Sequence, residues 1–130
     1  MITKTFIKNV EHESAIKHVT GKAIYTDDMP EPKNMLHAAI GFSSISRGII
    51  EKIDFADVFN SDGVIDIITD KDIKGQNDVG PIFKGDKIFT SKKIEYYGQP
   101  IFAVIATSTN LARKAVLKVK LKIKKLKPIL

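Results

Sequence analysis

The chain has 130 residues, of which 43% are hydrophobic and 28% are charged, a composition typical of one globular domain rather than of a disordered chain. It contains no cysteine, which excludes disulfides, thiolate metal sites, iron–sulfur ligation by this chain and a cysteine nucleophile. No segment approaches roughly 18 consecutive apolar residues, so no membrane span is predicted and we expect a cytoplasmic protein. We expect a single domain over residues 1–130, with about residues 1–12 as a flexible N-terminal segment.

The net charge of +6 arises near the C-terminus. Residues 1–110 carry 13 basic and 15 acidic side chains, whereas residues 111–130 carry eight basic side chains and no acidic one. One interpretation is an anionic partner such as nucleic acid. The other is a lysine-rich sheet edge that resists aggregation, or a compositional bias toward lysine. We favour the second, because residues 111–130 contain no aromatic side chain on which bases could stack.

The first half of the chain predicts short elements separated by turns. The residue pattern indicates a helical turn at 14–18, an extended segment at 22–26 and strands at 36–42, 49–54 and 64–69. Pro30 and Pro32 enforce a loop before the first strand. That strand, 36–42, is mostly apolar and is expected to be buried. Asp54 is placed to cap a short helix that ends before Gly63.

The second half begins with a long polar loop at residues 74–85, and loops of this length are often functional. Further strands are predicted at 87–90, 94–97 and 101–107, then a helix from Ser108 or Thr109 to about 117. Beyond the helix the period changes to two, which places Val119, Leu121 and Ile123 on the core side and Lys118, Lys120, Lys122 and Lys124 in solvent. The expected fold is a small α+β domain, a mixed sheet with short helices and a β–α–β unit over 101–126.

Few residues indicate chemistry. His12, His18 and His37 show no spacing typical of a metal site, and no G-x-S-x-G nucleophile motif is present. The adjacent carboxylates Asp27 and Asp28 precede a proline and are typical of a turn. No glycine pattern matches a nucleotide-binding loop. The residues by themselves therefore predict no catalytic, cofactor-binding or metal site.

Several short stretches, in their order and spacing, nevertheless resemble a known family. They are His12–Ala15, His18–Ala23, Tyr25–Pro32, Leu36–Ala39, Asp72–Ile73, Gly75–Asp78, Gly80–Ile82, Tyr97–Pro100, the apolar run 101–106, and Ala112–Arg113 with Ala115. Together they resemble the N-terminal domain of the molybdenum-binding subunit of bacterial xanthine dehydrogenase, in the xanthine dehydrogenase and aldehyde oxidase family. The similarity runs from about residue 11 to the end of the chain. One departure is the sequence Lys122–Lys124, where the family's final strand is usually acidic.

The resemblance implies an α/β-hammerhead fold and a structural, channel-lining role in a molybdenum hydroxylase that oxidises hypoxanthine and xanthine. The parent complex would use molybdopterin, FAD, [2Fe–2S] clusters and NAD, none of them bound by this chain. Its partners would be the remainder of the molybdenum-binding subunit and the FAD/iron–sulfur subunit. Because the family's catalytic residues lie beyond the matching region, we expect the chain to be one part of a longer or divided subunit and inactive alone. The alternative is a free-standing basic module that binds nucleic acid or another anionic partner.

The resemblance also assigns one site, the substrate-channel loop Pro81, Ile82 and Phe83. In the family, the loop that follows the glycine matching Gly80 presents apolar side chains at the mouth of the substrate channel. A second interpretation is that Phe83 folds back over the core as a lid. The two differ in exposure, because a channel loop predicts that Ile82 or Phe83 is exposed, whereas a lid predicts that Phe83 is buried.

Overall fold

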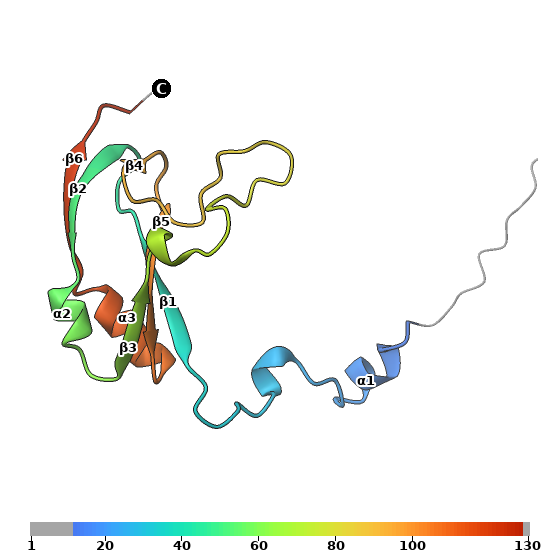
Figure 1. Cartoon of the computed structure of the whole chain (residues 1–130). Coiled ribbons are helices and arrows are strands. Elements are labelled where there is room, and N and C mark those ends of the chain that lie inside the picture. The colour runs from blue at the N-terminus through green and yellow to red at the C-terminus, as the bar shows by residue number, and fades with distance from the viewer. Residues whose placement is uncertain (1–11, 129–130) are drawn as a thin grey trace, which may run out of the picture. The chain divides into compact units, whose positions relative to one another are not determined.

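The computed structural model describes residues 12–128, which divide into two compact units whose boundary in the sequence falls between Lys33 and Asn34. The elements are α1 (Ala15–Val19), η1 (Thr26–Asp28), β1 (His37–Phe42), β2 (Gly48–Asp54), α2 (Ala56–Phe59), β3 (Val64–Ile68), η2 (Asp70–Asp72), β4 (Lys93–Ile94), β5 (Pro100–Ala106), α3 (Thr109–Val116) and β6 (Lys120–Lys125) (Figure 1). The single domain expected over 1–130 stays a prediction. Residues 1–11 of the expected flexible segment lie outside the described residues.

The first unit contains only α1 and η1. The predicted helical turn is confirmed as α1, none of whose residues is buried. The extended segment at 22–26 joins no sheet and leads into η1, where the Asp28 carboxylate accepts a hydrogen bond from the Tyr25 amide at 3.2 Å. The His18 ring lies 3.0 Å from the Tyr25 hydroxyl, measured from Nδ1. These contacts are local, so this unit has no apolar core of its own among the described residues.

The second unit contains two antiparallel three-stranded sheets, with strand orders β1-β5-β3 and β4-β2-β6 (Figure 1). The predicted α+β class is confirmed. The strands are divided between two sheets rather than joined in one, and β5 and β6 belong to different sheets. Helix α3 packs against β1 and β5. The segment expected to form a β–α–β unit therefore connects the two sheets through α3. It does not place β5 and β6 side by side as parallel strands of one sheet.

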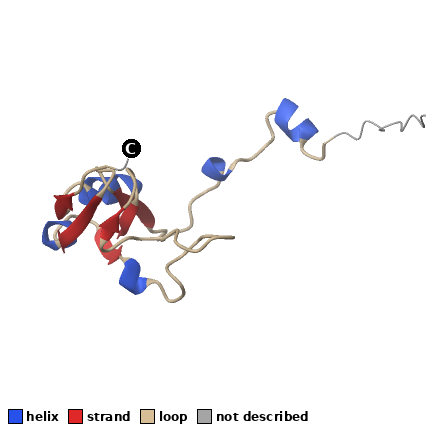
Figure 2. Cartoon of the chain, turned by 90° about the horizontal axis from the view of Figure 1, so that it is seen from above, coloured by secondary structure: helices blue, strands red, loops and turns tan. Residues whose placement is uncertain are grey.

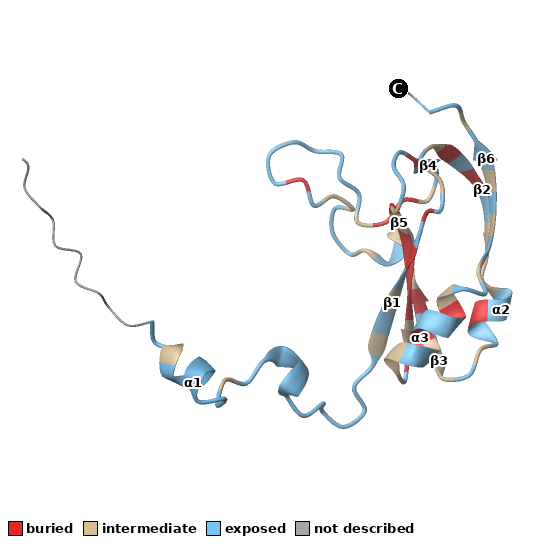
Figure 3. Ribbon diagram, turned by 180° about the vertical axis from the view of Figure 1, so that it is seen from behind, coloured by how far each residue is buried: buried red, intermediate tan, exposed pale blue. Residues whose placement is uncertain are grey.

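The strand predicted at 101–107 is confirmed as β5, which forms the centre of its sheet and is the most buried strand (Figure 3). Its largest buried side chain, Phe102, meets Phe55 edge-on with ring centroids 5.0 Å apart. A Cβ at Gly41, the residue opposite on β1, would overlap the Phe102 ring. Val58, from helix α2, and Ile94, from β4, are completely buried in the same core. The Phe102 ring of β5 thus lies against Gly41 on the edge strand β1 and against Phe55 just before α2.

Three strand predictions are corrected. Strand β1 forms where expected but lies at a sheet edge, so Ile40 and Phe42 are exposed rather than buried. Residues 87–90 form no strand, because the backbone of Phe89 bonds to a side chain instead of to a neighbouring strand. The strand expected at 94–97 is reduced to β4, because the Glu95 amide donates to Oε1 of Gln99 at 2.8 Å.

Strand β6 confirms the period of two that the sequence predicts. Leu121 and Ile123 are half-buried against the core, and the intervening lysines are exposed. Two of those lysines pair with acidic side chains, Lys120 with Asp57 at 2.7 Å and Lys122 with Glu51 at 3.2 Å. The hydrogen bond and charge of Lys120 lower the pKa of Asp57. Part of the basic charge is therefore compensated within the domain itself.

Candidate functional site

The longest irregular segment of the second unit connects η2 to β4, and it contains the predicted loop 74–85. Figure 2 shows it as loop throughout, and Figure 1 shows it projecting from the ends of the strands. With so little regular structure, the backbone of this segment must find its hydrogen bonds elsewhere. Two adjacent side chains, Asn77 and Asp78, provide four of them.

Asp78 closes a loop over residues 79–85. Its Oδ1 accepts a hydrogen bond from the Gly80 amide at 2.8 Å, and its Oδ2 accepts one from the Gly85 amide at 2.7 Å. A backbone hydrogen bond of 2.8 Å from the Val79 amide to the Asp86 carbonyl lies beside them. The hydrogen bond from Gly80, followed by that from Gly85, lowers the pKa of Asp78. The ionised carboxylate therefore holds both sides of the loop together at neutral pH.

Asn77 fastens the base of this loop to the core. Its Nδ2 donates to the Phe89 carbonyl at 2.7 Å, and its Oδ1 accepts from the Phe89 amide at 3.0 Å. Phe89 is buried, and the amide of its neighbour Thr90 donates to the Pro100 carbonyl of β5 at 3.0 Å. The Asn77 side chain thus makes the two hydrogen bonds with Phe89 that a neighbouring strand would otherwise make. It links the loop to the segment that bonds to the central strand β5.

Gly80 is the point of closest approach within the loop. It is buried, and a Cβ there would overlap the backbone oxygen of Phe83. No side chain can occupy this position without moving the backbone of the following turn. The glycine that the family resemblance singles out therefore has a steric role here.

The three predicted channel residues, Pro81, Ile82 and Phe83, lie together at the tip of the closed loop, and all are exposed. Ile82 is 82% exposed and Phe83 is 83% exposed. The expected exposure is confirmed, and the lid interpretation is wrong because Phe83 does not fold back onto the core. The channel role itself stays a prediction. Val79, at the base of the loop, is also exposed, at 63%.

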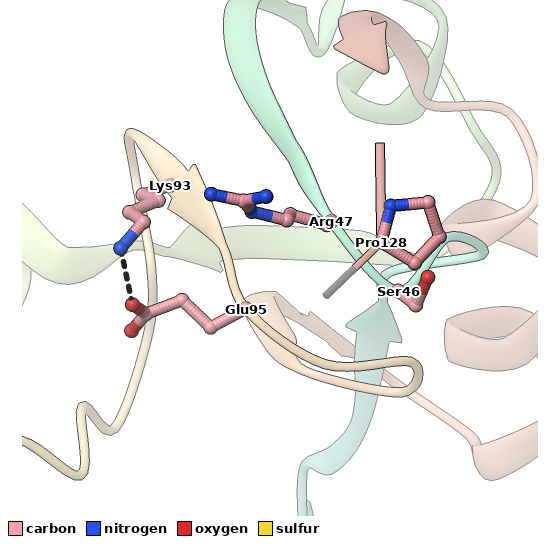
Figure 4. A pocket seen from close by; sticks show the side chains of 5 residues that line it. All are labelled: Ser46, Arg47, Lys93, Glu95 and Pro128. Atoms are coloured by element: carbon pink, nitrogen blue, oxygen red, sulfur yellow. Dashed lines mark hydrogen bonds and ion pairs between the residues drawn. The ribbon is translucent and has the colours of Figure 1, made fainter. Parts of the chain in front are cut away.

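A pocket of about 210 Å³ lies between β4 and the C-terminal segment, lined by Ser46, Arg47, Lys93, Glu95 and Pro128 (Figure 4). Its charged groups are already engaged. Lys93 pairs with Glu95 at 2.6 Å, and this hydrogen bond lowers the pKa of Glu95. Arg47 donates from Nη1 to the Lys127 carbonyl at 2.8 Å. Arg47 thus fastens the C-terminal segment beside the pocket, and the Lys93–Glu95 pair neutralises the other two charged groups of its lining.

Apolar side chains are also exposed away from the loop. An open groove is lined by Phe42, Ser43, Ser44, Tyr97 and Gly98. Other exposed apolar side chains of the second unit include Leu36, Ile40, Phe59, Ile65, Tyr96 and Leu117. Phe42 and Tyr97 come together in the groove, and apolar side chains grouped in this way typically mark a contact with another surface.

The residues do not fit a metal centre or an iron–sulfur cluster. The sequence has no cysteine, and residues 12–128 contain no group of three His, Asp or Glu side chains arranged to hold a metal ion. His12 and His18 lie in the first unit, whereas His37 in the second lies 2.9 Å from the Thr109 hydroxyl. Within the same described range, no helix has the length and apolar character needed to cross a membrane.

The sequence prediction missed the two residues that organise the loop. Asn77 and Asp78 belong to a stretch that carries the family resemblance, but no role was expected of them. A usable signal was present, because Asn and Asp side chains bond readily to nearby backbone amides in turns. The partners of Asp78 lie two and seven residues away, and that of Asn77 lies twelve away. No periodic pattern predicts such distances.

Known proteins resemble this chain in sequence. Residues 20–127 match the family described as aldehyde oxidase and xanthine dehydrogenase, a/b hammerhead domain. Xanthine dehydrogenase of Calliphora vicina is 36% identical over 120 residues, which are 92% of this chain and 9% of that protein. Aldehyde oxidase 2 of Rattus norvegicus is 35% identical over 121 residues, which are 93% of this chain and 9% of that protein.

A solved structure shows the same fold. The aldehyde oxidoreductase from Desulfovibrio gigas superposes with a TM-score of 0.76 at 34% identity, over 88% of this chain and 14% of that one. The two antiparallel sheets and short helices thus agree with the expected α/β-hammerhead. The chain spans about a tenth of the length of the curated relatives it matches. It belongs to the a/b hammerhead domain family of aldehyde oxidases and xanthine dehydrogenases.

Proposed function

We propose that this chain is a structural and substrate-channel-lining domain of a xanthine-dehydrogenase-like molybdenum hydroxylase. The observation that carries the proposal is the exposed apolar tip Pro81–Phe83, held on a closed loop. An apolar wall suits a planar heterocycle, which can lie against it without specific hydrogen bonds. Hypoxanthine and xanthine are the proposed substrates. This choice rests on the resemblance of His12–Ala15 and Gly98–Pro100 to bacterial xanthine dehydrogenases, since aldehyde oxidases are also among the relatives.

The proposed partners are the remainder of the molybdenum-binding subunit and an FAD/iron–sulfur subunit, in a cytoplasmic complex. Support comes from the open groove lined by Phe42 and Tyr97, whose exposed apolar side chains another protein surface would cover. In this proposal molybdopterin, FAD, [2Fe–2S] clusters and NAD belong to the parent complex. The described residues of this chain supply the channel wall and no ligand to those groups.

The channel role predicts the effect of shortening one side chain. In the assembled hydroxylase, Ile82→Ala should raise KM for the purine, or weaken a competitive inhibitor, by roughly tenfold. The chemical step should be little changed, because Ile82 contributes apolar contact and no reacting group. Steady-state kinetics measure KM and kcat. The matched control is Ile24→Ala, which shortens another exposed isoleucine, 71% exposed in the first unit. Equal KM values for Ile82→Ala and the unmodified enzyme would contradict the channel role.

The chain by itself should bind no catalytic metal. We expect the purified 130-residue protein to contain no stoichiometric molybdenum, iron or zinc, because it lacks cysteine and its described residues form no ligand cluster. It should also form no NADH from NAD and xanthine. Elemental analysis and an absorbance assay at the NADH band test the two statements. Stoichiometric metal, or xanthine-dependent NADH formation, would contradict them.

A further inference from the structure

We infer that Asn77 and Asp78 are positioning residues, which hold the apolar tip Pro81–Phe83 in the orientation that the channel requires. The inference rests on the proposed function. It adds two residues that make no direct contact with a substrate and act only through the loop. The argument depends on how the tip is held in place and on what else could hold it.

The tip has little packing of its own. Val79, Ile82 and Phe83 are all more than half exposed, so they bury little apolar area within the second unit. Apolar burial is usually what fixes a loop against its domain. Without it, the direction in which the tip points depends on the hydrogen bonds at its base.

Those hydrogen bonds act in two steps. The Asp78 carboxylate uses both oxygens to join the Gly80 and Gly85 amides, which closes the loop into a ring of fixed size. Bonds to an ionised acceptor are stronger than neutral ones, so the ring is well suited to resist opening. The Asn77 amide then joins the ring to Phe89, whose side chain is buried.

Gly80 makes the ring compact. Because a Cβ there would overlap the Phe83 carbonyl oxygen, the turn brings these two residues into direct contact. The Phe83 carbonyl thus lies against Gly80, whose amide donates a hydrogen bond to Asp78. A movement of the Asp78 carboxylate should therefore be transmitted to Phe83 and to its neighbour Ile82.

The first test uses the 130-residue chain and the pair Asp78→Asn and Asp86→Asn. Both variants remove one carboxylate near the ends of the loop, but the Asp86 side chain forms no hydrogen bond among the described residues. For Asp78→Asn we expect amide exchange at Gly80 and Gly85 to accelerate by at least about tenfold. Exchange at Val104, in the buried strand, should be unchanged. Asp86→Asn should leave all three amides unchanged.

The pH dependence of the same amides tests the role of charge. The folded-state pKa of Asp78 is lowered by its two amide hydrogen bonds, so the ring should stay closed above the ordinary carboxyl range. It should open only as the pH falls through the lowered pKa. The Gly80 and Gly85 amide resonances should follow that titration in the unmodified chain and lose it in Asp78→Asn. If the Gly80 and Gly85 amides titrate identically in both proteins, the claim that the Asp78 carboxylate holds the loop closed is overturned.

The second test uses the assembled hydroxylase and separates this inference from the proposed function. We expect Asp78→Asn to raise KM by roughly three- to tenfold with kcat nearly unchanged, and to add little when Ile82→Ala is already present. This non-additivity supports the inference, because a merely structural role would add independently. If Ile82→Ala raises KM but Asp78→Asn does not, the positioning role is overturned and the channel role stands. If neither variant raises KM, the channel role fails and the positioning role fails with it.

Discussion

Replacing Phe102 by alanine is expected to lower the free energy of unfolding by about 3–5 kcal/mol, the range for truncation of a buried aromatic side chain. Phe102 is completely buried in the central strand β5 and meets the Phe55 ring edge-on. Gly41 cannot fill the space, because it has no side chain and sits against the ring on the neighbouring strand. The cavity would therefore remain open. Denaturant titration of the 130-residue chain measures the difference.

The matched control for Phe102 is Phe42→Ala. Phe42 lies on the adjacent strand β1 but is 54% exposed, so the same truncation removes much less buried surface. We expect a loss of about 1 kcal/mol or less for Phe42→Ala, close to the usual effect of surface substitutions. Similar losses for the two variants would show that the core is not centred on β5.

The elements that the sequence predicts well are those with a strong local pattern. The run at 101–107 is almost entirely apolar and became the buried strand β5. Ser108 caps α3 as expected, with its hydroxyl accepting from the Leu111 amide at 3.3 Å. The alternation after Val119 became β6. In each of these cases, the information needed lies within about ten residues of the element.

The predictions that failed concern segments whose structure depends on distant residues. The segment 36–42 is apolar enough for a buried strand, but which strand occupies the sheet edge is decided by pairing between β3 and β5. Residues 87–90 have strand-like composition, yet Asn77, a residue in the preceding loop, takes the hydrogen bonds of Phe89. Local propensity is overridden when a side chain from elsewhere satisfies the backbone.

The candidate site shows the same division. Its apolar tip is conspicuous in a polar loop, but its role came from the family resemblance rather than from spacing. The channel interpretation predicted that Ile82 or Phe83 is exposed, and the structure decided between it and the lid interpretation. The residue types of Asn77 and Asp78 indicate bonds to nearby backbone groups, but the groups that they bond lie up to twelve residues away and meet them only in the fold. The sequence therefore shows which side chains can form hydrogen bonds, but not which part of the loop those bonds hold in place.

The remaining prediction concerns the lysine-rich strand β6. Leu121→Lys is expected to lower the free energy of unfolding by about 2–4 kcal/mol, through lost apolar burial and the cost of a charge near the core. Leu121 is half-buried, pairs in register with Ile53 of β2 and packs against the core. The long lysine side chain can carry its ammonium partly toward water, which keeps the loss at the lower end of what a fully buried charge would cost.

The matched control for Leu121 is the reverse exchange on the opposite face, Lys124→Leu. Lys124 is exposed and has no ion pair among residues 12–128, so this variant should change the free energy of unfolding by about 0.5 kcal/mol or less. The contrast tests the register directly, because a slip of one residue would move four lysines to the core face. Urea titration of both variants should therefore give a large loss for Leu121→Lys alone. A loss below about 0.5 kcal/mol for that variant would mean that Leu121 does not face the core, and the assignment of β6 would have to be reversed.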